Sequence, residues 1–118
     1  MQTYLDLLFI TNVAFIITHE LDAIRQGEWR FFFAPTNLSD QHAYRIFTAL
    51  HVPLFVLIIW NLNSFPFQVG FDIFLMVHAG LHWLLREHPL IDFNNGFSRF
   101  WIFGGSLLGA LHIILLWV

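Results

Sequence analysis

The sequence contains no cysteine and no lysine, and charged residues make up only 11% of its 118 residues. Without cysteine, the chain has no disulfides, no thiolate metal ligands and no cysteine nucleophile. A soluble domain carries about a quarter charged residues, so this low fraction disfavours a soluble protein. The five basic residues form no patch suited to a phosphate backbone, and we expect no nucleic-acid partner.

Hydrophobic residues instead account for 58% of the chain, and the mean hydropathy is +0.67. A membrane-spanning helix needs about 20 mostly apolar residues, and four such helices with short connections account for this length. The apolar residues run all round the expected helices. We therefore predict an all-α, integral membrane four-helix up-down bundle, a single transmembrane domain over 1–118. The expected helices span 3–25, 41–62, 67–86 and 97–118, with an interfacial segment at 27–38.

All the basic residues lie in or beside the connectors that follow the first and third expected helices: Arg25, Arg30, Arg45, Arg86 and Arg99. By the positive-inside rule, these connectors are cytoplasmic and both termini are outside. We expect the bacterial inner membrane as the location and the lipid bilayer as the immediate partner.

Ionisable residues close the first apolar run, at His19, Glu20 and Asp22. Such groups are expensive inside a bilayer and need partners there. Histidines within the other apolar segments are available as partners, at His51, His78 and His82. At 1.5 Å rise per residue, the four histidines fall in one layer about 8 Å thick in the cytoplasmic half.

Imidazoles at one depth with carboxylates nearby predict a zinc or non-haem iron site. The expected metal ligands are His19, His78 and His82, with His51 as a possible fourth. Glu20 and Asp22 are the candidate catalytic residues, as a metal ligand, as an orienting group or as a general base. The metalloprotease H-E-x-x-H pattern is absent, because Ala23 stands where its second histidine would be.

Other interpretations of the same residues remain open. Two histidines on different helices can clamp a b-type haem, which would make the protein an electron carrier. A polar chain can pass protons or a metal ion, and a non-catalytic structural subunit needs no site at all. His112 and Asp72 lie equally near the outer ends of their helices, and we expect them to pair with each other.

The stretch Thr18-His-Glu-Leu-Asp-Ala-Ile, together with Glu28-Trp-Arg, resembles small bacterial four-helix membrane proteins grouped as a domain of unknown function. More distantly, it is similar to the membrane family named for a His-x-x-Glu-Glu motif. That motif is not met here, since Asp22 and Ala23 stand where its two glutamates would be. The resemblance implies a stand-alone membrane protein distinguished by its histidines and acidic residues, and it implies no particular activity.

The function expected from these features is metal-dependent hydrolysis of a lipid-like or amphipathic small molecule, with an iron oxygenase second. The segment Trp29-Arg30-Phe31 would cover the mouth of the site. Gly105 and Gly109 form a G-x-x-x-G spacing, which indicates close helix contact in lipid. This face is a candidate surface for a homo-oligomer.

Overall fold

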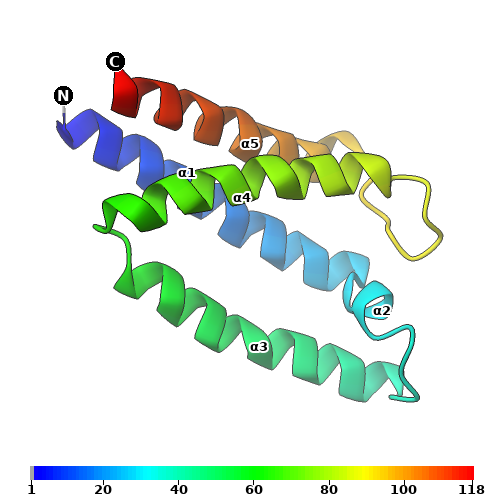
Figure 1. Ribbon diagram of the computed structural model, residues 1–118. Helices are drawn as coiled ribbons and strands as arrows, with labels where there is room; N and C mark the ends of the chain where they lie inside the picture. Colours follow the sequence, from blue (N-terminus) through cyan, green and yellow to red (C-terminus); the bar gives the residue numbers. More distant parts are fainter. Residues whose placement is uncertain (1) are drawn as a thin grey trace.

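The computed structural model describes residues 2–118, which form five α-helices and no strand. The helices are α1 (Gln2–Gln26), α2 (Trp29–Phe32), α3 (Asp40–Trp60), α4 (Phe65–Leu84) and α5 (Gly96–Trp117). The four long helices run in alternating directions, so both termini lie at one end of the molecule (Figure 1). The opposite end, called the loop end below, carries α2 and the connectors 27–39 and 85–95. The all-α prediction is confirmed.

Polar side chains fix where two of the long helices begin. Ser39 accepts a hydrogen bond from the backbone N–H of His42 at the start of α3. Asn95 does the same for the N–H of Ser98 at the start of α5. These side chains satisfy backbone donors that have no partner inside the helix, and so they define the loop-end bounds of α3 and α5.

Helix α5 packs closely against both α1 and α4, and glycines allow this approach. A Cβ atom added at Gly109 would lie 3.2 Å from the side-chain nitrogen of Asn12 and 3.3 Å from the backbone oxygen of Asp72. One added at Gly105 would touch the side chains of Asn12 and Phe15. The G-x-x-x-G face is therefore covered by α1 and α4 within one chain.

Helix α3 lies apart from this group of three (Figure 1). It is joined to the rest by α2, by a contact between His51 and Glu20, and by Ile58, which packs in an apolar cluster with Phe9 and Phe71. The arrangement is thus three closely packed helices with a fourth beside them. The four-helix bundle expected from the sequence is not confirmed, because α3 meets the other long helices at few positions.

Three of the helices, α1, α3 and α5, are long and apolar enough to cross a membrane. Helix α4 is not among them, since it carries the polar residues Gln68, Asp72, His78 and His82. Its polar and apolar residues are nevertheless distributed in an unusual way. Gln68, Asp72 and His82 are buried, whereas the large apolar side chains of α4 that are exposed include Ile73, Phe74, Val77, Leu81 and Leu84.

Candidate metal centre

Four side chains converge near the loop end: His19 of α1, His78 and His82 of α4, and Glu28 just before α2. One ligand atom from each residue can be chosen so that all four atoms lie within 4.8 Å of one another. The Nε2 atoms of His78 and His82 are 3.2 Å apart, and Nε2 of His82 is 3.5 Å from a carboxylate oxygen of Glu28. The ring of His19 lies against both other rings, with centroid distances of 4.8 and 5.1 Å.

The ring nitrogens of this group lack hydrogen-bond partners to a degree that is rare for buried atoms. His19 is fully buried, and neither of its ring nitrogens has a partner anywhere in residues 2–118. Within the same residues, Nδ1 of His82 is also buried and unpartnered. A buried polar atom left unsatisfied costs about 1–3 kcal/mol. A bound metal ion would satisfy such nitrogens, so the donor set fits a transition-metal ion.

The positions of the three histidines follow from the helices that carry them. Four residues separate His78 from His82, so both project from one face of α4. Along α1, His19 lies between Ile16 and Ala23, which belong to two different apolar clusters. The site is thus a polar layer held between two packed apolar layers.

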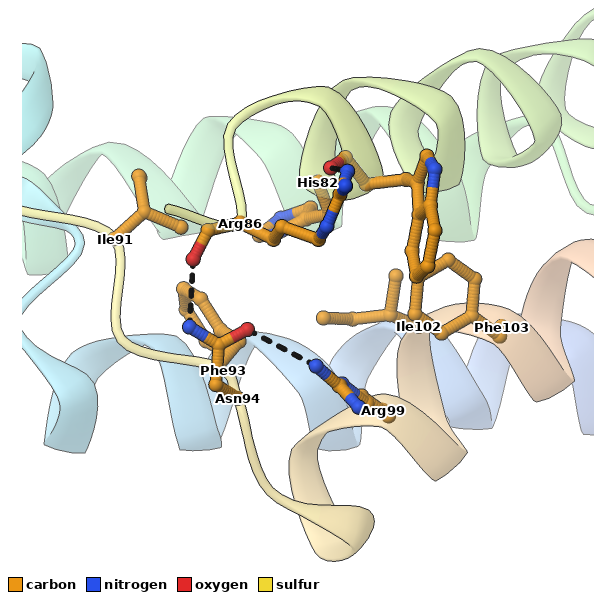
Figure 2. A pocket seen from close by; sticks show the side chains of 9 residues that line it. His82, Arg86, Ile91, Phe93, Asn94, Arg99, Ile102 and Phe103 are labelled. Atoms are coloured by element: carbon orange, nitrogen blue, oxygen red, sulfur yellow. Dashed lines mark hydrogen bonds between the residues drawn. The ribbon is translucent and has the colours of Figure 1, made fainter. Parts of the chain in front are cut away.

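The connector between α4 and α5 closes one side of this layer. Phe93 is buried and packs on His19 and His82, with ring centroids 5.4 and 4.8 Å away. Asn94 holds the connector in place: it donates to the backbone oxygen of Arg86 and accepts from the guanidinium of Arg99 (Figure 2). The pocket drawn there has a volume of about 10 Å³, roughly that of one water. This pocket therefore has room for about one water beside His82.

Glu28 reaches the histidines because the chain reverses at Gly27. This glycine has a φ of 69°, in the left-handed region. The N–H of Glu28 donates to the carbonyl of Ala23 at 3.0 Å, and the N–H of Gly27 donates to that of Ile24 at 3.2 Å. These two bonds are the Schellman ending of a helix. Glu28 is consequently turned back and only 7% exposed.

The sequence analysis did not include Glu28 among the expected metal ligands. The available signal was Gly27, because a glycine directly after the last turn of a helix predicts this chain reversal. The residue after such a glycine packs back toward the helix instead of continuing outward.

The structure does not bring His51 into the group of four. Its Nε2 lies 2.6 Å from a carboxylate oxygen of Glu20, and its Nδ1 donates to the backbone oxygen of Phe47 at 2.7 Å. With Nδ1 protonated, the bond to Glu20 needs a second proton on either the imidazole or the carboxyl group. Glu20 and His51 therefore form a separate proton-sharing pair that joins α1 to α3.

Asp22 is also directed away from the metal ligands. One of its carboxylate oxygens accepts a hydrogen bond from the hydroxyl of Ser98 at 2.5 Å, and the other accepts one from the side chain of Gln26 at 3.5 Å. Ser98 stands in the first turn of α5. Asp22 thus anchors α5 to α1.

A cavity borders the four-residue group on the side of α2. This cavity of about 110 Å³ is lined by three members of the group, Glu28, His78 and His82. The remaining lining is apolar and includes Phe31 and Phe32 of α2. Of the segment expected from sequence to cover the mouth of the site, Phe31 lines this cavity, whereas Trp29 and Arg30 do not.

A family model described as a family of unknown function, DUF6713, matches residues 5–118. The chain belongs to this family. All four members of the candidate metal centre lie inside the range that the DUF6713 model matches. No curated protein and no solved structure matches the chain.

Proposed function

We propose that this member of DUF6713 is an integral membrane protein that binds one zinc or iron ion through His19, Glu28, His78 and His82. One observation carries the proposal: these ligand atoms converge within 4.8 Å, and buried nitrogens among them lack any partner in residues 2–118. A haem would need its two axial histidines on opposite sides of a macrocycle. Donors this close together suit the coordination of a single ion instead.

The proposal includes α4 as a fourth membrane-spanning helix. The buried face of α4 carries polar residues such as Asp72, which is 0% exposed. Its exposed face carries apolar residues such as Val77, which is 55% exposed. Water would favour the opposite distribution, whereas lipid favours this one. We further propose that the loop end lies on the cytoplasmic side of a bacterial inner membrane and that both termini lie outside. The positive-inside rule supports this orientation, because all five arginines lie at or beside the loop end.

The reaction we propose for the site is hydrolysis of a lipid-like substrate. An ion held by these residues would supply an activated water and polarise a carbonyl or phosphoryl oxygen. Glu28 lines this cavity together with His78 and His82, so a carboxylate oxygen that does not hold the ion is placed to accept a proton there. The apolar lining from α2 and α4 suits a substrate with hydrocarbon next to the scissile group.

The test is metal analysis of protein purified in detergent without chelator, together with its visible spectrum. We expect about one zinc or iron per chain and no Soret band. His19→Ala and His82→Ala should each lose the ion. His42→Ala is the matched control, because His42 is exposed at the start of α3 and bonds Ser39 instead of the cluster.

Equal metal content in all three variants would overturn the proposal, as would a Soret band. A hydrolase is further tested by release of product from lipid esters by the metal-loaded protein. Loss of that release in Glu28→Gln with the metal retained would assign proton transfer to Glu28.

A further inference from the structure

A second cavity lies between α1, α3 and α4, where α3 stands apart from the other helices. Its volume is about 440 Å³, which is within the range of small-molecule binding sites. The lining is almost wholly apolar and includes Ile16 of α1, Leu54 and Ile58 of α3, and Phe67 and Phe74 of α4. Gly70 contributes no side chain, and a Cβ atom added there would meet nothing within 4 Å. The cavity is therefore a formed space of ligand size.

This cavity faces the surface that we assign to lipid. Leu57 of α3 and Phe74 of α4 both line it and are 54% and 52% exposed. The neighbouring exposed side chains on both helices are apolar as well, including Val56 and Ile73. A hydrocarbon chain could thus pass between α3 and α4 directly from the bilayer without crossing water.

The one ionisable residue in the lining is Glu20. One of its carboxylate oxygens is bonded to His51, and the other has no hydrogen-bond partner among the residues that the structure describes. Glu20 directly follows His19, one of the proposed ligands, in the sequence. The polar end of this cavity therefore lies beside the proposed metal centre.

We infer that the cavity binds the alkyl chain of a single-chain lipid whose head group donates a hydrogen bond, as a long-chain alcohol does. The chain would occupy the apolar space, and the hydroxyl would donate to the free oxygen of Glu20. A carboxylate head group is disfavoured at this position, since it has no hydrogen to donate to the free oxygen of Glu20. The inference goes beyond the proposed function, since this cavity is lined by Glu20, whereas the cavity beside the metal centre is lined by Glu28, His78 and His82.

The experiment uses a long-chain alcohol that carries a diazirine on its alkyl chain. The full-length protein is stripped of metal with chelator, labelled by light, and the modified residues are located by mass spectrometry. We expect labelling of 54–58 and 67–74 that an excess of unlabelled alcohol suppresses. Labelling of outward-facing apolar residues should not be suppressed, because bulk lipid contact does not saturate.

In Gly70→Phe, the part of the labelling that unlabelled alcohol suppresses should fall at least about tenfold, because the phenylalanine ring would fill the cavity. The matched control is Gly80→Phe, which also adds a ring to α4 where nothing lies within 4 Å, but Gly80 does not line the cavity. A fatty acid of the same chain length should suppress the labelling more weakly than the unlabelled alcohol does. In Glu20→Gln, the difference between the two competitors should be smaller. Equal labelling in the two glycine variants, or labelling that never saturates, would overturn the inference.

Metal content measured on the same samples before stripping separates the two proposals. Metal bound by wild-type protein and by Gly70→Phe, with labelling that does not saturate, would remove the lipid cavity and leave the metal centre. Saturable labelling of a protein that never binds metal would remove the metal centre and leave the lipid cavity.

Discussion

Two of the groups that pair histidines with acidic side chains in this protein differ in what their polar atoms contact. Toward the termini, Asp72 bonds both of its neighbours: one oxygen lies 2.6 Å from Nδ1 of His112, and the other accepts from Asn12 at 2.9 Å. At the loop end, both nitrogens of His19 are unpartnered among residues 2–118, and other donors converge on them. Both oxygens of Asp72 are satisfied by protein partners in the first group, whereas the donor set of the second group could hold a metal ion.

The comparison shows why a buried histidine alone does not identify a site. His112 and His19 are both fully buried. The polar atoms left over in the first group, Nε2 of His112 and Oδ1 of Asn12, belong to residues whose other polar atom already bonds Asp72. We therefore assign the Asp72 group to stability and the His19 group to binding.

The largest effect should come from removing the centre of the stability group. Asp72→Ala leaves His112 and Asn12 buried without their shared partner, and breaking a buried pair in this way costs about 3–5 kcal/mol. We expect a large drop in the thermal unfolding temperature in detergent, with one metal still bound per folded chain. Asp72→Asn is the matched control and should lose less stability, because the amide keeps its shape and part of its bonding. Metal loss from folded Asp72→Ala would contradict the division into two groups.

The next prediction distinguishes His78 from His51, which lie at similar depth along their helices. His78→Ala removes a proposed ligand and should weaken metal binding at least about 100-fold, since loss of a group that merely orients a ligand already costs about 10–100-fold. His51→Ala should leave the affinity within about threefold, because His51 bonds Glu20 outside the cluster. Competition with a chromogenic chelator measures both affinities. Equal losses would show that His51 is a ligand.

These two histidines also show how far the sequence can predict the site. Rise along a helix fixes depth, which is why the positions of His19, His78 and His82 within their helices are enough to predict one shared layer. Rotation about the helix axis and the distance between helices are not fixed in this way. His51 shares the layer but belongs to α3, which stands apart, so its nearest acidic partner is Glu20.

The pairing of His112 with Asp72 was predictable and is confirmed, because both lie equally near the helix ends at the termini. The hydrogen-bond partner of Asp22 could not be predicted in this way. Depth places it beside the histidines, but its side chain turns to Ser98, a partner 76 positions away in sequence. Tertiary contacts of this kind leave no periodic signal in the sequence of either helix.

A smaller effect is expected where the backbone positions a ligand without touching the metal. Gly27→Ala places a side chain at a φ of 69°, where an L-residue is strained by about 1–2 kcal/mol, and its Cβ would lie 2.7 Å from Nε of Arg30. We expect Glu28 to withdraw and metal affinity to fall about tenfold, the equivalent of about 1.4 kcal/mol. Glu28→Gln should give a similar loss of metal affinity, because it replaces the carboxylate ligand itself. If the affinity of Gly27→Ala is unchanged, Glu28 is not held in place by this turn.

The smallest effect tests whether Asp22 serves stability or the site. Ser98→Ala removes the hydroxyl that bonds Asp22. In a soluble protein, the loss of one buried hydrogen bond to a charged group lowers the free energy of unfolding by about 1.5–3 kcal/mol. Between helices in lipid the loss is smaller, and about 0.6 kcal/mol is typical. The expected shift in unfolding temperature is small, and metal affinity should not change, because Asp22 faces α5 and not the three histidines. Asp22→Asn should behave in the same way, since an amide can still accept from Ser98. A fall in metal affinity or in lipid-ester hydrolysis in either variant would move Asp22 from the structural group into the site, which is the role that the sequence alone suggested.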